Sequence, residues 1–407
     1  MKRSISLFLV LIFLISAFFC GCKKNGNKND YAVTNDGIIN VGVLLPLSGE
    51  AENIGDKISD GLNYAYKLAP GVNINNDKKH LINLIYEDIN EGVEDACEKF
   101  KGSNVSAVIC YSSTSEITDK IVSSFKNEST ALIFTDCNSD SVLKADNALT
   151  IGIPFSYQAS VASSYFIDNG FKVGAVVSPG NDYGKNASKL FKDTFISSGG
   201  TSVSEYNYNC EDANFNANTI AGSELEFVFL VGSEQDTAEL YTQLKTAGVT
   251  IPVMLSEVLD KTVIEDKMFD GAVYISKFEQ DDSNYIGTDF IKSYAKMNDM
   301  ASSDITTATA YGYDAYMMLY GALMSFNSNS NSLSSIGNTD NFESSAPVQV
   351  SASQVLEALK TAAHMGVTDS ITFSDNGAVN TKFLYLGTVQ NSNAIMLNKY
   401  NYNNEAN

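Results

Sequence analysis

The chain is nearly devoid of arginine, has no tryptophan and contains only two histidines among its 407 residues. Arg3 is the single arginine, and it lies in the first segment of the chain. An anionic ligand must therefore be held by hydroxyl groups, backbone N–H groups, helix N-termini or lysine. The net charge of -21 argues against nucleic acid as a partner, because binding to phosphates needs basic patches.

Motifs of catalysis are also missing. His80 and His364 are the available imidazole bases, and neither belongs to a nucleophile motif or a metal-ligand pair. The sequence contains no G-x-S-x-G, no H-E-x-x-H, no Walker loop and no G-x-G-x-x-G. We therefore expect no enzyme and no cofactor, although hydrolysis by carboxylates alone stays open.

The chain begins with the features of an exported protein. Lys2 and Arg3 precede an apolar run of about fifteen residues, which is shorter than the roughly 20 that a spanning helix needs. Cys20 and Cys22 close this run, and a polar, glycine-containing stretch follows. We expect a signal peptide over residues 1–21 and a flexible tether over residues 22–38. Plain secretion, with Cys20 and Cys22 in a disulfide, is the alternative.

The four later cysteines are Cys97, Cys110, Cys137 and Cys210, and their spacing is not that of a metal site. Four cysteines allow three disulfide pairings, among which the sequence does not choose. We expect buried free thiols.

From residue 39 onward, short apolar runs alternate with amphipathic helical stretches. "IINVGVLLP" is typical of a buried parallel strand, and Ile54, Ile58, Leu62 and Tyr66 are spaced along one helix face. This βαβα alternation predicts parallel sheets covered by helices. More than about ten strand candidates favour two sheets over one, with a break near residues 151–160. A serine- and asparagine-rich tract, residues 327–349, predicts a polar surface insert.

Hydroxyl-rich loops follow two successive predicted strands. "CYSSTSE", residues 110–116, and "TDCNSDS", residues 135–141, each precede a helix, so N–H groups at its start can meet an anion. Glu257 follows a later strand, where its carboxylate can meet a cation. Ordinary helix caps and a solvated glutamate are the alternatives.

The segments "PLSGEAENIGDKISDGLNYA", "YEDINEG", "ICYSST", "GNDYGKNASKLFKDTF", "YDAYMMLYGAL" and "ITFSDNG" occur in the order and spacing of one family. The chain resembles the type I solute-binding proteins of bacterial ABC importers, the branched-chain amino acid receptors. That resemblance implies an α/β fold of two doubly wound parallel-sheet lobes joined by three hinge crossovers, near Pro154, Lys277 and Asn376. The N-terminal lobe then comprises residues 39–154 and 278–376, and the C-terminal lobe residues 155–277 and 377–402.

The same resemblance implies where an amino acid would be held. Its carboxylate would lie against Tyr111 or Ser112, Cys137 and Ser139, and its ammonium against Glu257. Tyr183 and Tyr313 match aromatic residues that line the cleft, and Ser233 stands where family members commonly carry a tyrosine. The end of the apolar run is similar to a lipobox, in which Gly21 precedes the lipid-bearing Cys22.

The function expected from these features is capture of a small solute, an α-amino acid above all, by a lipoprotein outside the cytoplasm. Its partners would be the solute, the transmembrane subunits of an ABC permease and, through the lipid, the cell membrane. The alternatives are a receptor for an amide, urea or another neutral solute, and a sensory or structural lipoprotein that feeds no transporter.

Replacing Cys22 by Ser tests the anchor. Because a diacylglycerol on this cysteine is the expected link to the bilayer, the variant should be released from membranes or accumulate as precursor. Fractionation after labelling with a radioactive fatty acid checks this. Label retained by the Cys22→Ser protein would contradict the assignment, and Cys20→Ser should leave labelling unchanged.

Overall fold

The structure is a computed structural model, and the fold described here covers most of the chain beyond residue 30. The predicted signal peptide, Cys22, the insert 327–349, Cys137, Ser139 and Cys210 all lie outside the described residues. Within the described part, no helix combines the length and the apolar composition needed to cross a membrane. The described residues are 31–33, 37–49, 51–74, 79–112, 115–136, 141–209, 213–257, 261–279, 284–326 and 350–403.

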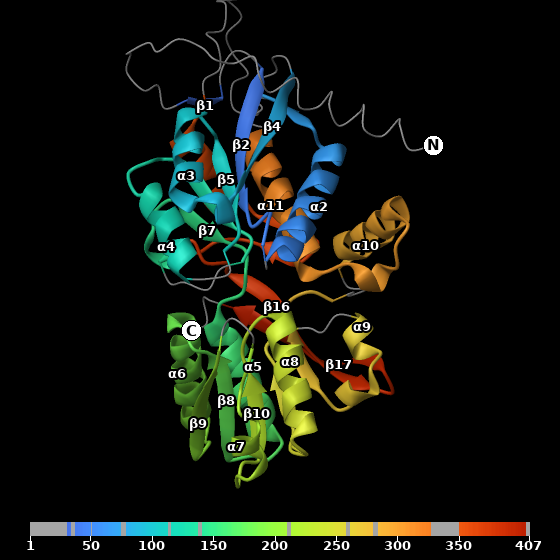
Figure 1. The fold of residues 1–407 in the computed structure, drawn as a ribbon. Coiled ribbons are helices and arrows are strands. Elements are labelled where there is room, and N and C mark those ends of the chain that lie inside the picture. The colour runs from blue at the N-terminus through green and yellow to red at the C-terminus, as the bar shows by residue number, and fades with distance from the viewer. Residues whose placement is uncertain are drawn as a thin grey trace, which may run out of the picture. The chain divides into compact units, whose positions relative to one another are not determined.

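The first sheet has six strands in the order β3-β4-β2-β5-β6-β7 (Figure 1). All neighbours pair in parallel except β3, which is antiparallel to β4. The inner strands are apolar runs that are buried along their length, as expected for a sheet covered on both faces. The strands are β2 (Ile38–Leu45), β3 (Gly71–Asn73), β4 (Lys79–Asp88), β5 (Ala107–Cys110), β6 (Ala131–Phe134) and β7 (Ala148–Thr150).

Helices cover both faces of this sheet because side chains alternate along each strand. On β5, Ala107 and Ile109 join the apolar cluster under α2, α11 and α12, whereas Val108 and Cys110 join the cluster under α3 and α4. α10 packs beside α2 and α11 through a smaller aromatic cluster. The helices are α2 (Glu52–Leu68), α3 (Val93–Gly102), α4 (Ser115–Ser124), α10 (Tyr285–Asn298), α11 (Thr307–Met324) and α12 (Ala352–Thr361).

The second sheet has seven strands in the order β17-β16-β12-β11-β10-β8-β9. Phe166 of α5 stacks on Phe227 of β10 with 3.7 Å between ring centroids, in the cluster that also holds α6. α8 packs on the opposite face. The strands are β8 (Val173–Pro179), β9 (Ser202–Tyr208), β10 (Phe227–Leu230), β11 (Val253–Leu255), β12 (Val273–Ser276), β16 (Thr381–Gln390) and β17 (Asn393–Asn403), and the helices are α5 (Phe155–Asp168), α6 (Asp182–Ser197), α7 (Asn218–Ala221), α8 (Glu234–Thr246) and α9 (Lys261–Ile264).

The chain passes from one sheet to the other three times: after β7, after β12 and before β16. The first and third crossovers contact each other, since the Thr150 N–H donates to the Gly377 carbonyl at 3.0 Å. The predicted fold class of two α/β lobes is therefore confirmed, and the precise lobe boundaries stay predictions.

One segment differs from the expectation of a tether up to residue 38. β1 (Tyr31–Val33) pairs antiparallel with β13 (Val350–Ser351), so backbone hydrogen bonds replace the predicted random coil there. A second two-stranded pair, β14 (His364–Gly366) with β15 (Asp369–Ile371), is held on α11 by Asp314, whose carboxylate accepts the N–H groups of Val367 and Thr368.

Two of the four later cysteines lie in the described part of the chain. Cys97 and Cys110 are both buried in the cluster beneath α3 and α4. Cys97 is a free thiol, and burial raises its pKa to about 11. The prediction of a buried free thiol is therefore confirmed for Cys97, which is unreactive at neutral pH.

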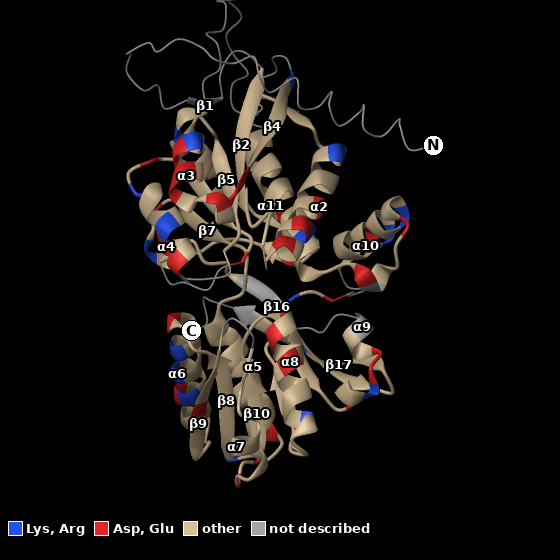
Figure 2. Ribbon diagram, viewed as in Figure 1, with Lys and Arg blue, Asp and Glu red and all other residues tan. Residues whose placement is uncertain are grey.

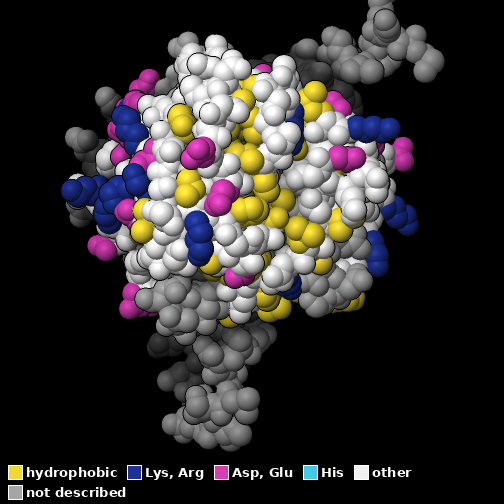
Figure 3. All heavy atoms as spheres, turned by 90° about the horizontal axis from the view of Figure 1, so that it is seen from below, with side chains coloured by type: hydrophobic (Ala, Val, Ile, Leu, Met, Phe, Trp, Pro, Cys, Tyr) yellow, Lys and Arg dark blue, Asp and Glu magenta, His cyan; other side chains and the backbone are white. Residues whose placement is uncertain are grey.

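Charges of both signs are interspersed over the helices (Figure 2). On α6, for example, Lys189 pairs with Asp193 one turn later. The face seen from below carries hydrophobic side chains across its middle and many charged side chains toward its margins (Figure 3). Scattered apolar side chains of this kind are usual at protein surfaces.

Two glycines allow α2 and α11 to pack closely. A Cβ atom at Gly61 of α2 would lie 1.9 Å from the Thr309 carbonyl oxygen of α11. At Gly312 of α11, a Cβ atom would lie 2.1 Å from the Ile58 carbonyl oxygen. Neither backbone atom can move without displacing its helix, so the contact requires glycine at both positions.

Gly61→Ala should destabilise the protein by at least about 1–3 kcal/mol, the usual cost of overpacking. Gly321→Ala is the matched control on α11, because nothing lies within 4 Å of its Cβ position; it should be neutral or stabilise by up to about 1 kcal/mol. Urea unfolding followed by circular dichroism measures both. Equal stability of the two variants would show that the helices separate without cost.

Candidate solute-binding site

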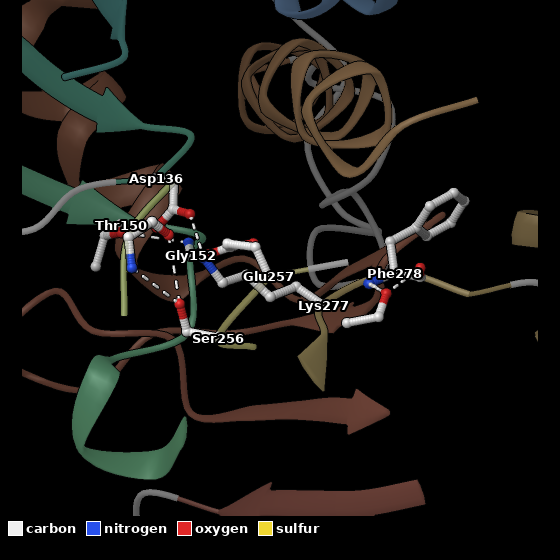
Figure 4. Close-up of polar contacts among 9 residues, drawn as sticks. Asp136, Thr150, Gly152, Ser256, Glu257, Lys277 and Phe278 are labelled. Carbon is white, nitrogen blue, oxygen red and sulfur yellow. Dashed lines mark hydrogen bonds and ion pairs between the residues drawn. The ribbon is translucent and has the colours of Figure 1, made fainter. Parts of the chain in front are cut away.

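Three charged side chains meet where strands of both sheets end (Figure 4). Glu257 follows β11, and Lys277 follows β12, its parallel neighbour in the second sheet. Asp136 follows β6 of the first sheet. Ligands of open parallel sheets bind at the carboxyl ends of the strands, so these residues occupy the expected position for a ligand site.

Lys277 joins the other two residues. Its Nζ lies 2.8 Å from Asp136 Oδ2 and 2.8 Å from Glu257 Oε1. The lysine side chain is 6% exposed, whereas those of Asp136 and Glu257 are 23% and 29% exposed. One nearly buried ammonium thus connects the loop after β6 to the loop after β11, which belong to different sheets.

The ion pairs set the protonation of the site. Burial by itself lowers the pKa of the Lys277 ammonium, but the charges of Asp136 and Glu257 outweigh it and the pKa lies well above its ordinary value. Burial raises the pKa of the Glu257 carboxyl, although Lys277 acts in the opposite direction. The ammonium therefore stays charged at neutral pH, and Glu257 is the group whose ionised form is disfavoured by its surroundings.

The first crossover positions Asp136. A Cβ atom at Gly152 would lie 2.4 Å from Asp136 Oδ1, so only glycine lets this carboxylate lie against the crossover. The Gly152 N–H in turn donates to Thr150 Oγ1 at 3.2 Å. Asp136 therefore lies between the first crossover and Lys277 of the second (Figure 4).

Three tyrosines surround the charges. Tyr111 follows β5, Tyr183 lies in the first turn of α6, and Tyr311 lies on α11. Burial raises the pKa of each phenol, and the charges of Asp136, Glu257 and Lys277 also act on that pKa. All three hydroxyls are therefore protonated and neutral at neutral pH.

Two predicted hydroxyl residues have structural partners of their own. Ser112 Oγ lies 2.7 Å from Thr118 Oγ1 at the buried start of α4. Ser233 caps α8, because its Oγ accepts the Asp236 N–H at 3.1 Å. These contacts match the alternative of ordinary helix starts, so their role toward a ligand stays a prediction.

The aromatic residue expected from α11 lies elsewhere. The Tyr313 ring packs against Phe290 of α10, with centroids 4.8 Å apart, and against Tyr64. Tyr311, two residues earlier, is the α11 tyrosine that feels the three charges. Of the predicted site residues, the structure thus brings Tyr111, Tyr183 and Glu257 together, and Cys137 and Ser139 lie outside the described residues.

Sequence reasoning did not assign Asp136, Lys277 or Tyr311 to the site. Asp136 stands inside the "TDCNSDS" loop, in which the hydroxyl groups are the predicted ligands, and Lys277 is predicted only as a crossover position. The sequence does carry a signal for them: Lys277 directly follows a buried strand and Asp136 follows another after Thr135, at the sheet edge where ligands bind. Glu257 meets a cation of the protein itself, because Lys277 Nζ lies 2.8 Å from its carboxylate.

The chain forms two α/β lobes, one around each sheet, and three crossovers join them. Charged and tyrosine side chains lie at the carboxyl ends of the strands. This arrangement is typical of receptors of the two-lobed α/β class. A sequence profile of the periplasmic binding protein family matches residues 38–393. The chain belongs to this family. Among curated proteins, no match is found.

Solved structures share the fold at low sequence identity. A leucine-binding protein of Thermotoga maritima is 18% identical, with a TM-score of 0.73 over 90% of this chain and 99% of its own. The isoleucine complex of a branched-chain amino acid binding protein of Streptococcus pneumoniae is 18% identical, with a TM-score of 0.71 over 89% and 100%. A benzoate complex of a solute-binding protein of R. palustris is 16% identical, with a TM-score of 0.72 over 88% and 95%.

Lys277→Met should lower the free energy of unfolding by roughly 3 kcal/mol, since loss of one partner leaves buried charge uncompensated. The loss should be larger at pH 8 than at pH 5. Glu257 has a raised pKa in the folded protein, so its ionisation costs stability as the pH rises from the unfolded through the folded value, and without Lys277 that cost grows.

Urea unfolding at the two pH values measures this. Lys189→Met, which removes an exposed ion pair on α6, is the control and should cost no more than about 1 kcal/mol. A loss for Lys277→Met as small as that of the control would contradict the ion-pair geometry.

Proposed function

We propose that the protein is an extracytoplasmic receptor that captures a small solute between its two lobes and delivers it to an ABC permease, tethered to the membrane through Cys22. The observation that carries the proposal is the meeting of Asp136, Lys277 and Glu257, from both sheets, at the strands' carboxyl ends. Such a site is reached by residues of both lobes, so a solute there can hold the lobes together.

An α-amino acid is the solute that this site favours. With all three charges present, Asp136, Lys277 and Glu257 sum to a formal charge of one negative unit, and an ammonium group would balance it. Glu257 is the most exposed of the three and accepts only the Lys277 hydrogen bond in the described part of the chain. The proteins of Thermotoga maritima and Streptococcus pneumoniae, which share this fold, are described as binding leucine and isoleucine.

Lys277 supports a second candidate, an aromatic carboxylate. The chain has no arginine for a carboxylate beyond residue 3, so this lysine is the full positive charge nearest to Tyr111 and Tyr183 among the described residues. Two proteins of the same fold, at 16% and 13% identity, are described in complex with benzoate and with 3,4-dihydroxybenzoic acid.

A neutral solute such as urea or an amide is compatible with the same site, because Lys277 already pairs with the Glu257 carboxylate and the solute need not supply a cation. A sensory or structural lipoprotein would use the same two lobes but would deliver no solute to a permease.

A thermal-shift screen distinguishes the solutes. The twenty amino acids, benzoate, 3,4-dihydroxybenzoate, urea and acetamide are each added to the full mature chain. A true ligand at about 100 times its dissociation constant adds roughly 2.7 kcal/mol, so the melting temperature should rise by a few degrees. We expect an amino acid to give the largest rise. A rise with benzoates alone would transfer the assignment to aromatic acids, and no rise at all would contradict the receptor function.

Glu257→Ala tests the clamp with the solute so identified. If Glu257 receives the ammonium, its loss should cost about 3–5 kcal/mol, or two to three and a half decades in affinity. Titration calorimetry measures this beside Asp193→Asn, a control on exposed α6 that should bind as the parent does. Unchanged affinity of Glu257→Ala would mean that no ammonium is bound there.

A further inference from the structure

The solute-facing carboxylate of this site is already paired within the protein. Lys277 places its ammonium 2.8 Å from Glu257, the residue proposed to receive the ammonium of a solute. The same ammonium lies 2.8 Å from Asp136. A receptor that relied on Glu257 alone would not need a second carboxylate or a lysine at this point.

The position of Lys277 is strongly constrained. Its side chain is 6% exposed, and it extends from the second crossover to Asp136, which itself lies against Gly152 of the first. Asp136 and Lys277 are 141 positions apart in the sequence, so this contact is made by the fold and not by local chain geometry. The backbone of Lys277 is therefore placed by the second crossover, and its ammonium is held by Asp136 and Glu257.

We propose that Lys277 and Asp136 are specificity-determining residues that set the net charge of the site, so that it accepts solutes with an ammonium group and rejects solutes that carry only a carboxylate. This inference rests on the proposed function and extends it to two residues that the family resemblance does not include. Lys277 lies 2.8 Å from both carboxylates and offsets one of their charges, and Asp136 supplies the second negative charge that leaves the formal sum at minus one.

Coulomb's law gives the size of the effect. At an effective dielectric constant of about 20, one unit charge about 5 Å from a charged group of the solute changes its binding by roughly two orders of magnitude. Solvent reaches Glu257 and Asp136, which are 29% and 23% exposed, and screens this interaction. We therefore expect the affinity for the solute to change by about tenfold or more.

The two residues should act in opposite directions. Removing the charge of Lys277 makes the site more negative, which favours a cation over an anion. Removing the charge of Asp136 makes the site neutral, which favours an anion relative to a cation. A purely structural role would weaken all solutes in the same proportion and leave their ratios unchanged.

The experiment uses three matched probes: leucine, its analogue without the carboxylate, 3-methylbutylamine, and its analogue without the amino group, 4-methylpentanoate. Calorimetry on the mature protein gives the affinity of each for the parent, Lys277→Met and Asp136→Asn. The ratio of amine to carboxylate affinity should rise at least tenfold in Lys277→Met and fall at least tenfold in Asp136→Asn. Lys189→Met and Asp193→Asn, which remove the same charges from an exposed pair, should leave the ratio unchanged.

The outcomes separate this inference from the function on which it rests. If the parent binds leucine but neither variant changes the ratio, the specificity role is wrong and the receptor function stands. If the parent binds 4-methylpentanoate and not leucine, the charge rule is overturned in favour of an acid receptor. If the parent binds none of the three probes, a leucine-like solute is ruled out and the specificity role is contradicted, whereas the receptor function is decided separately by the thermal-shift screen. Should Lys277→Met not fold, Asp136→Asn decides alone.

Discussion

The double ion pair of Lys277 is the interaction on which the site depends. A lysine side chain with only 6% exposure is costly to keep charged, and Asp136 and Glu257, each 2.8 Å away, provide the compensation. Because the two carboxylates come from different sheets, the same contact that neutralises the lysine also brings the carboxyl ends of both sheets to one place. The contact that compensates the charge of Lys277 therefore also places the carboxyl ends of the two sheets beside each other.

Backbone geometry makes this contact possible. The three crossovers lie together, since Thr150 of the first bonds to Gly377 of the third, and Gly152 leaves room for Asp136 against Lys277 of the second. A larger residue at position 152 would push Asp136 away from the lysine. The glycine therefore matters for the close approach of a carboxylate, and less for its own backbone freedom.

Two of the predicted hydroxyl residues have structural partners, which match the alternative of ordinary helix caps. Ser112 bonds to Thr118, and Ser233 caps α8, so both satisfy groups at the starts of helices. The charged residues beside them carry the feature that is specific to this site. A serine before a helix commonly caps it through a local hydrogen bond. A lysine that pairs with two carboxylates far away in the sequence finds them only in the folded chain.

The sequence by itself determined the α/β alternation, the two sheets and the position of Glu257 after a strand, because each depends on local apolar patterns and on where a strand ends. The helix Glu52–Leu68 followed from the same kind of pattern, with Ile54, Ile58, Leu62 and Tyr66 on one face. Only the tertiary structure decided that Lys277 meets Asp136 across 141 residues, that Tyr311 and not Tyr313 feels these charges, and that β1 pairs with β13. The physical reason is that local propensity sets a residue's element and face, whereas its partner depends on how the sheets and crossovers pack.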